Sequence, residues 1–240
     1  MHLVWYQIQY RKGKESIMNK KVIAVLVLAL LVVSFAAARF INFQLGPSVS
    51  FFKGEAPLED EGTLRTPYKG FAFGLDTAVD LTIGPRAEIY FQDTINVALK
   101  DVFADFEKSE WIQKEFDDKF TIDYKTHAGF EFAVVTDPVK VSVGGGLALE
   151  VVATNFIFKE DQTKGFILLD LNMGLGATVK VEYPLANHWS VYARAFVDYF
   201  PVAGLGIGNY PNESGDEPYT AKGRVNNFSV DASAGIVLYF

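Results

Sequence analysis

The chain has 240 residues, of which half are apolar, and a formal net charge of −7. A chain of this length predicts one domain, with or without a targeting segment. The sequence contains no cysteine, which excludes disulfides, thiol catalysis and cysteine-based zinc sites, and its acidic balance argues against nucleic acid as a partner.

The first segment with a clear pattern is MNKKVIAVLVLALLVVSFAAA, residues 18–38. A pair of lysines precedes an apolar run, and three alanines follow that run. This order of basic, apolar and small residues predicts a secretory signal peptide. An uncleaved anchor helix is the alternative, but the run is slightly short for a span and the alanines favour cleavage. Residues 1–17 then form an upstream extension, and either Met1 or Met18 starts the protein.

Beyond the signal peptide the sequence alternates between apolar and polar residues with a period of two, which predicts β-strands. In GFAFGLDTAVDLTI, for example, Phe71, Phe73 and Leu75 share one face, whereas Asp76 and Asp80 share the other. Eight such stretches follow one another, over residues 39–52, 70–83, 86–99, 120–134, 139–153, 167–183, 189–200 and 228–240.

The third stretch interrupts this pattern. Asp93 falls on the face that also carries Ile89, Phe91 and Ile95. A bulge near Gln92–Thr94 would restore the phase, and the alternative is that the strand ends there.

The connections between the strands alternate in length. Three are short turns, at 84–86, 136–138 and 184–188, whose residues are typical of turns. The other four are long and acidic, over about 53–69, 101–118, 155–165 and 203–223.

Two kinds of fold fit an alternating chain. A soluble barrel or sandwich turns its apolar face inward, whereas an outer-membrane barrel turns it to lipid and lines its interior with the polar face. Four features favour the outer-membrane barrel. Ionisable residues stand in mid-strand, and the strands are often longer than about ten residues. Short turns alternate with long loops, and aromatic residues lie near both ends of the strands. The sequence therefore predicts an all-β fold, an eight-stranded antiparallel transmembrane β-barrel over residues 39–240.

The end of the chain supports the same interpretation. Phe240 is the last residue, and apolar residues stand at every second position before it, among them Leu238 and Ile236. Over residues 39–240 the chain resembles the small bacterial outer-membrane barrels of the OmpA, OmpX and OmpW type, and its last strand resembles the signal that the outer-membrane insertion machinery reads. The resemblance implies the outer membrane as location and membrane lipid and that machinery as partners. Members differ in function, so it implies no single activity.

One short motif suggests an enzyme. His188 and Ser190 have the His-x-Ser spacing of lipid A deacylase barrels, in which the serine would be the nucleophile and the histidine its base. The motif adjoins a short turn and should face the periplasm, while that substrate lies in the outer leaflet. We therefore predict no catalytic residue. Acidic loop clusters lack a metal-binding signature, so we predict no metal site and no cofactor.

Ionisable residues on the polar faces are predicted to line the lumen and pair there. The lumen of so small a barrel is filled by side chains, and a charge in it is costly unless it is paired. Paired catalytic carboxylates are the weaker alternative. We expect Arg194 and Asp231 to bond to each other, with Lys180 and Asp198 as neighbours. The predicted network contains Asp76, Asp80, Lys125, His127, Lys180, Arg194, Asp198 and Asp231.

Three functions fit a barrel of this kind. The first is a structural or surface-interaction role, adhesin-like, in which the long loops contact an extracellular ligand. The second is a narrow pore for small or apolar solutes, and the third is a lipid-modifying enzyme. A lumen blocked by charge pairs would favour the first function, whereas an open or dry lumen would favour the second.

The terminal aromatic residue should matter for assembly. Deleting Phe240 should leave export intact but impair insertion, so that chains accumulate in the periplasm rather than in the outer membrane. Cell fractionation and immunoblotting would measure the distribution. Normal outer-membrane levels of the deletion variant would contradict a role for Phe240 as an insertion signal.

Overall fold

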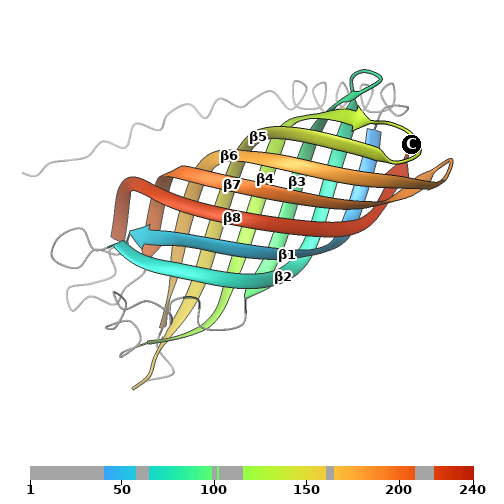
Figure 1. Cartoon of the computed structure of the whole chain (residues 1–240). Helices are drawn as coiled ribbons and strands as arrows, with labels where there is room; N and C mark the ends of the chain where they lie inside the picture. Colours follow the sequence, from blue (N-terminus) through green and yellow to red (C-terminus); the bar gives the residue numbers. More distant parts are fainter. Residues whose placement is uncertain (1–40, 58–64, 99–101, 103–115, 161–164, 209–218) are drawn as a thin grey trace, which may run out of the picture. The chain divides into compact units, whose positions relative to one another are not determined.

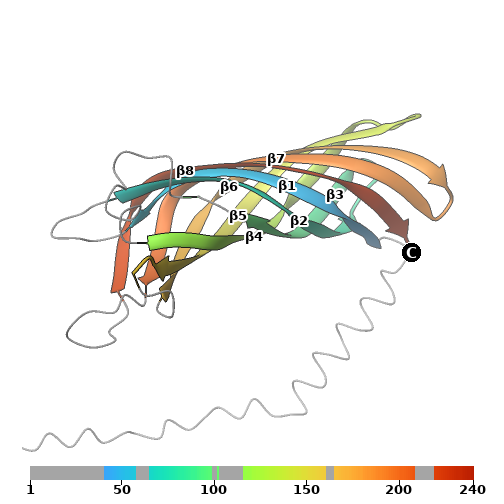
Figure 2. The same cartoon turned by 90° about the horizontal axis from the view of Figure 1, so that it is seen from below.

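The computed structural model describes residues 41–57, 65–98, 102, 116–160, 165–208 and 219–240. The proposed extension at 1–17 and signal peptide at 18–38 lie outside them. The predicted fold is confirmed: eight antiparallel strands follow one another around a closed barrel (Figures 1 and 2). The strands are β1 (Ile41–Pro57), β2 (Arg65–Thr82), β3 (Ala87–Ala98), β4 (Phe116–Val135), β5 (Lys140–Phe158), β6 (Gly165–Ala186), β7 (Trp189–Gly208) and β8 (Tyr219–Tyr239).

The barrel closes where β1 meets β8. Asn42 lies opposite Tyr239 in this antiparallel pair, and the Phe240 amide donates a hydrogen bond to the Ile41 carbonyl at 3.4 Å. The two backbones approach closely at Gly46 and Gly235, where an added Cβ would overlap the facing carbonyl oxygen in each case. Glycine at these two positions therefore allows the seam to form.

The barrel has an apolar outer surface and a polar interior. Phe73 is 62% exposed and Leu147 66%, whereas Asp123 and Lys125 are completely buried. A soluble barrel would show the opposite distribution, because water would then cover the outside. The alternation in the sequence thus describes a lipid-facing surface. Among the described residues, no helix is long and apolar enough to cross a membrane.

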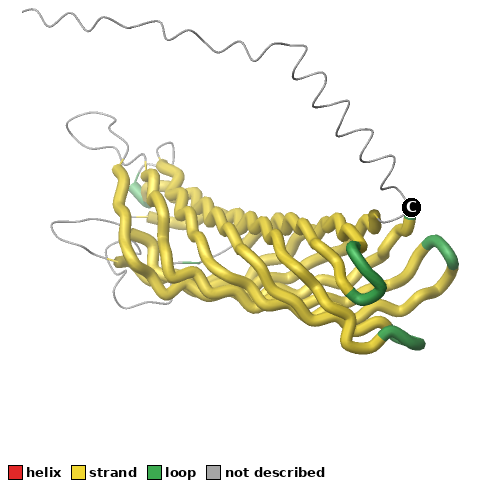
Figure 3. The backbone as a smooth tube through the Cα atoms, turned by 90° about the horizontal axis from the view of Figure 1, so that it is seen from above, coloured by secondary structure: helices red, strands yellow, loops and turns green. Residues whose placement is uncertain are grey.

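The three short turns lie together at one end of the barrel, which we call the turn end, and the C-terminus lies there too (Figure 3). At the opposite end, the loop end, the strands are longer than predicted. Pro57 still pairs with Arg65, and Gly208 with Tyr219. The expected loop boundaries were therefore wrong by several residues. Backbone pairing continues beyond the apolar outer band, where the inward side chains are apolar too and the contrast from which the strands were predicted is lost.

The bulge predicted near Gln92–Thr94 is wrong, and so is its alternative. Strand β3 keeps a continuous register with both neighbours through Asp93, which lies opposite Thr77 on β2 and Thr126 on β4. The phase is conserved, so the Asp93 side chain stays on the outer face and is exposed. A single polar residue at an outward position therefore explains why the sequence pattern of β3 looks interrupted at Asp93.

Cysteine labelling from outside intact cells tests the orientation of the barrel. The native chain has no cysteine, so each single variant has a clean background. Glu160→Cys, in an exposed position at the loop end, should react with a membrane-impermeant maleimide. Asp137→Cys, in a turn, should react only after the cells are broken. Labelling of Asp137→Cys in intact cells would reverse the orientation.

Candidate functional site

The candidate site is the interior of the barrel. The structure places all eight residues of the sequence-derived charge network there, buried among side chains from the facing strands. Buried acidic side chains outnumber buried basic ones among the described residues, so neutral donors also contribute to the network. The polar contacts divide into groups at successive levels between the turn end and the loop end.

The first group surrounds two cations near the turn end. Lys180 Nζ lies 2.5 Å from Asp80 Oδ2, 2.9 Å from Glu131 Oε2 and 3.2 Å from Glu88 Oε2. Arg194 Nη2 lies 2.8 Å from Glu131 Oε1, so Glu131 joins the two cations. Every one of these side chains is nearly or completely buried, which makes the pairing obligatory.

The carboxylates of Asp80, Glu88 and Glu131 are close enough together to suggest a metal site. The Lys180 ammonium contacts all three, however, and the Arg194 guanidinium contacts two of them. The chain therefore supplies the positive charge that a metal ion would bring, and the arrangement is an ion cluster of the protein's own side chains.

Aromatic rings separate this group from the next. The Arg194 guanidinium lies 5.6 Å from the ring centroid of Tyr90 and 5.7 Å from that of Phe196. Phe196 in turn stacks on the His127 ring at a centroid distance of 4.3 Å. His127 Nε2 lies 3.0 Å from Asp198 Oδ2, and Gly176 leaves the room that this carboxylate occupies. Flat rings thus fill the width of the lumen between two charged levels.

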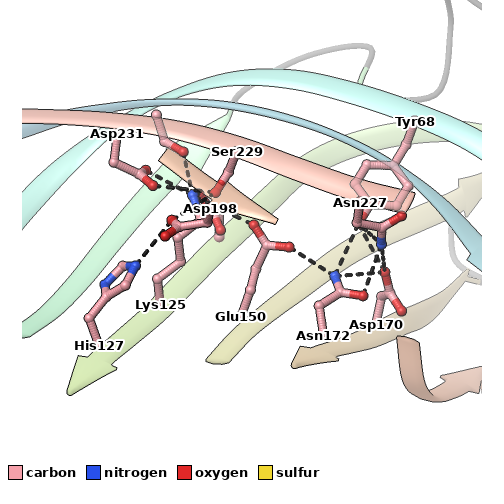
Figure 4. A network of polar contacts seen from close by, with 12 residues as sticks. Tyr68, Lys125, His127, Glu150, Asp170, Asn172, Asp198, Asn227, Ser229 and Asp231 are labelled. Atoms are coloured by element: carbon pink, nitrogen blue, oxygen red, sulfur yellow. Dashed lines mark hydrogen bonds and ion pairs between the residues drawn. The ribbon is translucent and has the colours of Figure 1, made fainter. Parts of the chain in front are cut away.

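The second ion cluster surrounds Lys125 (Figure 4). Lys125 Nζ donates hydrogen bonds to Ser50 at 2.6 Å, Asp123 at 2.7 Å and Asp231 at 2.8 Å, and it lies 3.6 Å from Glu150. These partners come from β1, β4, β8 and β5, so one ammonium group joins opposite walls of the barrel. An ammonium has three donors, which matches the three short contacts.

A third group, near the loop end, contains no basic side chain among the described contacts. Asn172 Nδ2 donates to Glu150 at 2.8 Å and to Asp170 at 3.1 Å, which links this group to the Lys125 cluster (Figure 4). Tyr68 donates to Asp170 at 2.9 Å, and Asn227 donates to the Asn172 side-chain oxygen at 2.9 Å. Neutral amide and phenol donors therefore bind Asp170, which Lys125 does not contact, and supplement the longer contact of Lys125 with Glu150.

An apolar layer lies above this group at the loop end. Phe52, Phe156 and Leu168 are at most 2% exposed although they point inward. Val102, between β3 and β4, joins them, and its carbonyl accepts a hydrogen bond from the Lys69 amide at 3.0 Å. Val102 is thereby attached to β2 at the barrel mouth. Among the described residues, the buried members of this layer are Phe52, Tyr68, Ala72, Ala98, Val102, Val152, Phe156 and Leu168.

The expected pair of Arg194 and Asp231 is wrong. Arg194 lies opposite Ser233 and Asp231 opposite Phe196 on the paired strands β7 and β8. Arg194 bonds to Glu131 on β4, and Asp231 bonds to Lys125 on β4. Long side chains in a narrow barrel reach across the axis, and their partners are therefore found on the opposite wall rather than on the adjacent strand.

The His-x-Ser motif does not form a catalytic pair in the contacts that the structure describes. Ser190 is buried and donates a hydrogen bond to Glu182 at 2.8 Å, with the Tyr239 hydroxyl at 2.8 Å as a second partner. His188 is exposed in the turn between β6 and β7.

Sequence reasoning did not include the neutral lumen residues or the apolar layer. Tyr68 fell within a predicted loop, although it lies four residues before the inward Ala72 and therefore on the same face of the strand. Phe52 and Val152 have the parity of the inward Ser50 and Glu150. Extending the period-two phase beyond the apolar bands would have placed all three inside the barrel.

Comparison with known structures agrees with this geometry. The outer membrane protein OprG from Pseudomonas aeruginosa superposes with a TM-score of 0.55 at 10% identity, over 85% of this chain and 97% of OprG. A major outer membrane protein from Thermus thermophilus superposes with a TM-score of 0.51 at 15% identity, over 81% of this chain and 99% of that protein. This chain has the fold of the small outer-membrane β-barrels.

At these identities the likeness concerns the fold alone. No family model matches the sequence of this outer-membrane barrel, and no curated protein matches it. Its outward apolar band and its charged interior are properties of its own residues, and they agree with a location in the outer membrane.

Double-mutant cycles distinguish the observed pairing from the pairing expected from the sequence. Lys125→Met should lower the free energy of unfolding by about 3–5 kcal/mol, because it leaves buried carboxylates without their cation. The coupling energy between Lys125→Met and Asp231→Leu should be about 2 kcal/mol, and that between Arg194→Leu and Asp231→Leu less than half of this. Urea unfolding of the barrel in lipid vesicles would measure both.

The matched control is an ion pair on the surface of the same barrel. Lys159 Nζ lies 3.7 Å from Asp117 Oδ1, and both side chains are more than 40% exposed. Lys159→Met should change the free energy of unfolding by less than about 1 kcal/mol. Equal effects of Lys125→Met and Lys159→Met would show that the Lys125 cluster does not hold the interior together.

Proposed function

We propose that this outer-membrane barrel is a surface-interaction protein that is closed to solutes and acts through its loop end. The filled lumen carries the proposal. Lys125 joins β1, β4, β5 and β8 at one level, and Arg194 joins β7 to β4 at another. Gln92 on β3 accepts a hydrogen bond from Arg194, and Tyr68 on β2 donates one to Asp170 on β6. Side chains of all eight strands therefore belong to the polar network that fills the lumen.

The hairpins at the loop end support the same function. The β1–β2 ladder continues to Pro57 and Arg65, well past the exposed aromatic residues Phe51 and Phe71. The β7–β8 ladder continues to Gly208 and Tyr219. Paired strands that leave the lipid-facing band carry the connections between them away from the membrane, toward other molecules.

The partner that fits best has a basic surface. The segment between β1 and β2 contains Glu59, Asp60 and Glu61, and acidic residues also predominate between β3 and β4. Opposite charges increase the rate of encounter and select among partners. The partner is therefore a basic extracellular protein or matrix component, with binding that weakens as salt increases.

One observation favours a second candidate, a narrow pathway for apolar solutes. Phe52, Phe156 and Leu168 give the barrel mouth an apolar lining that such a solute would meet first. The charged levels below this layer oppose passage along the axis, because an apolar molecule would have to displace paired ions. An enzyme is the least supported candidate, because Ser190 donates its hydrogen bond to Glu182 and its expected base, His188, lies exposed in the turn.

Conductance in planar bilayers tests whether the lumen is closed. The unmutated barrel should show no sustained current, because the Lys125 cluster crosses the lumen. Asp231→Ala removes one of the short contacts of Lys125 and should produce leak currents, so that this variant also shows that the assay detects opening. Stable conductance by the unmutated barrel would overturn the closed lumen and favour the pore.

Binding of intact cells to a surface coated with a basic peptide tests the second half of the proposal. Replacing Glu59, Asp60 and Glu61 with the corresponding amides should reduce binding, and the loss should be greatest at low salt. The equivalent amide change at Asp137, an exposed acidic residue at the turn end, provides the control. Unchanged binding by the loop variant would contradict an interaction role for this segment.

A further inference from the structure

Two lysines lie side by side on the outer face of the barrel, toward its loop end. Lys53 on β1 and Lys69 on β2 are direct partners in the antiparallel ladder. Lys53 is exposed and Lys69 is half-buried. Directly opposed residues of such a ladder have Cβ atoms about 4.5–5.5 Å apart, so the two flexible side chains can bring their ammonium groups to one small anion.

These lysines stand where the outer face changes from apolar to charged. On the turn-end side, the next outward residues are Phe51 on β1 and Phe71 on β2. On the loop-end side, the next outward residue of β1 is Glu55. Aromatic residues collect at the borders of the lipid-facing band in outer-membrane barrels. The lysines therefore lie at the level of the lipid head groups, and the rings lie at the level of the acyl chains.

The rings form a continuous apolar surface on the same two strands. Phe71 and Phe73 are 56% and 62% exposed, and they meet edge to face with their centroids 5.1 Å apart. Phe51, which is 39% exposed, is the direct partner of Phe71. Acyl chains pack on such rings through apolar contact, which is non-directional and selects no particular lipid. Selection among lipids on this face therefore depends on the lysines.

We propose that Lys53 and Lys69 bind the phosphate of a lipid head group and hold that lipid against β1 and β2. Ammonium groups form charge-assisted hydrogen bonds with phosphate oxygens, and these are stronger than hydrogen bonds between neutral groups. Two ammonium groups on directly opposed residues repel each other, and a phosphate that contacts both offsets the repulsion. The acyl chains of the same lipid then lie on the rings of Phe51, Phe71 and Phe73.

The surrounding charges favour a lipid over an anion from solution. Glu55 lies on the loop-end side of the lysines, and the connection between the same two strands contains Glu59, Asp60 and Glu61. These carboxylates repel an anion that approaches from the water. A lipid reaches the lysines from within the bilayer, where its acyl chains already place its head group at the correct level.

Native mass spectrometry of the purified barrel in detergent tests the proposal. The probes are lipid A and the same lipid after enzymatic removal of its phosphate groups. The unmutated barrel should retain lipid A and lose the dephosphorylated form. Replacing both Lys53 and Lys69 with glutamine should reduce the retained fraction about tenfold, because each lysine near a membrane surface adds to the attraction for anionic lipid. Replacing both with arginine should preserve retention, since the positive charges remain.

The matched control removes one lysine elsewhere at the loop end. Lys53→Gln should lower retention of lipid A, whereas Lys159→Gln, at an exposed lysine that pairs with Asp117, should not. Circular dichroism should show that these variants fold, because both side chains are exposed. The proposal is overturned if dephosphorylated lipid A is retained equally, if Lys53→Gln has no more effect than Lys159→Gln, or if inorganic phosphate displaces the lipid, which would show a site for free anions.

Discussion

Hydrocarbon offers the backbone no hydrogen-bond partner, and the other features of this barrel follow from that constraint. Every strand must pair on both sides, so β8 has to meet β1. Closure with eight strands fixes the width of the lumen, and an interior of that width is filled by side chains. The polar face of each strand therefore meets side chains of the opposite wall, and the described residues form a hydrogen-bonded interior there.

The interior meets this demand with few cations and many neutral donors. Lys125 and Lys180 each contact three carboxylates, and Asn172 donates to Glu150, one of these, and to Asp170. A buried ion pair adds little stability over a well-packed apolar pair, but a broken one is strongly destabilising. The network therefore determines which side chains meet more than it raises stability, and it supports the proposal of a closed lumen.

The architecture could be predicted from the sequence because it depends on a single pattern, the alternation of apolar and polar residues along each strand. Alternation with a period of two assigned the strands and their outer and inner faces, and the length of the connections gave the barrel its two ends. The pairing of charges could not be predicted, because it depends on how the sheet closes. Arg194 and Asp231 are near each other in the β7–β8 hairpin, yet Glu131 and Lys125, both on β4, are their partners. Asp93 was misjudged for a simpler reason: one polar residue on an apolar face looks the same as a change of phase.

The seam between β1 and β8 has a consequence for how the molecule is made. Each of the other seven interfaces joins strands that are neighbours in sequence, so it can form locally, whereas Asn42 must find Tyr239 across nearly the whole chain. Contacts of such large sequence separation form slowly, because the entropy lost in closing the chain is not repaid until the last pairing is made. Until that moment an incomplete sheet exposes two edges, each ready to pair with another chain. A barrel of this design therefore passes through its most aggregation-prone form just before the pairing of β1 with β8 closes it.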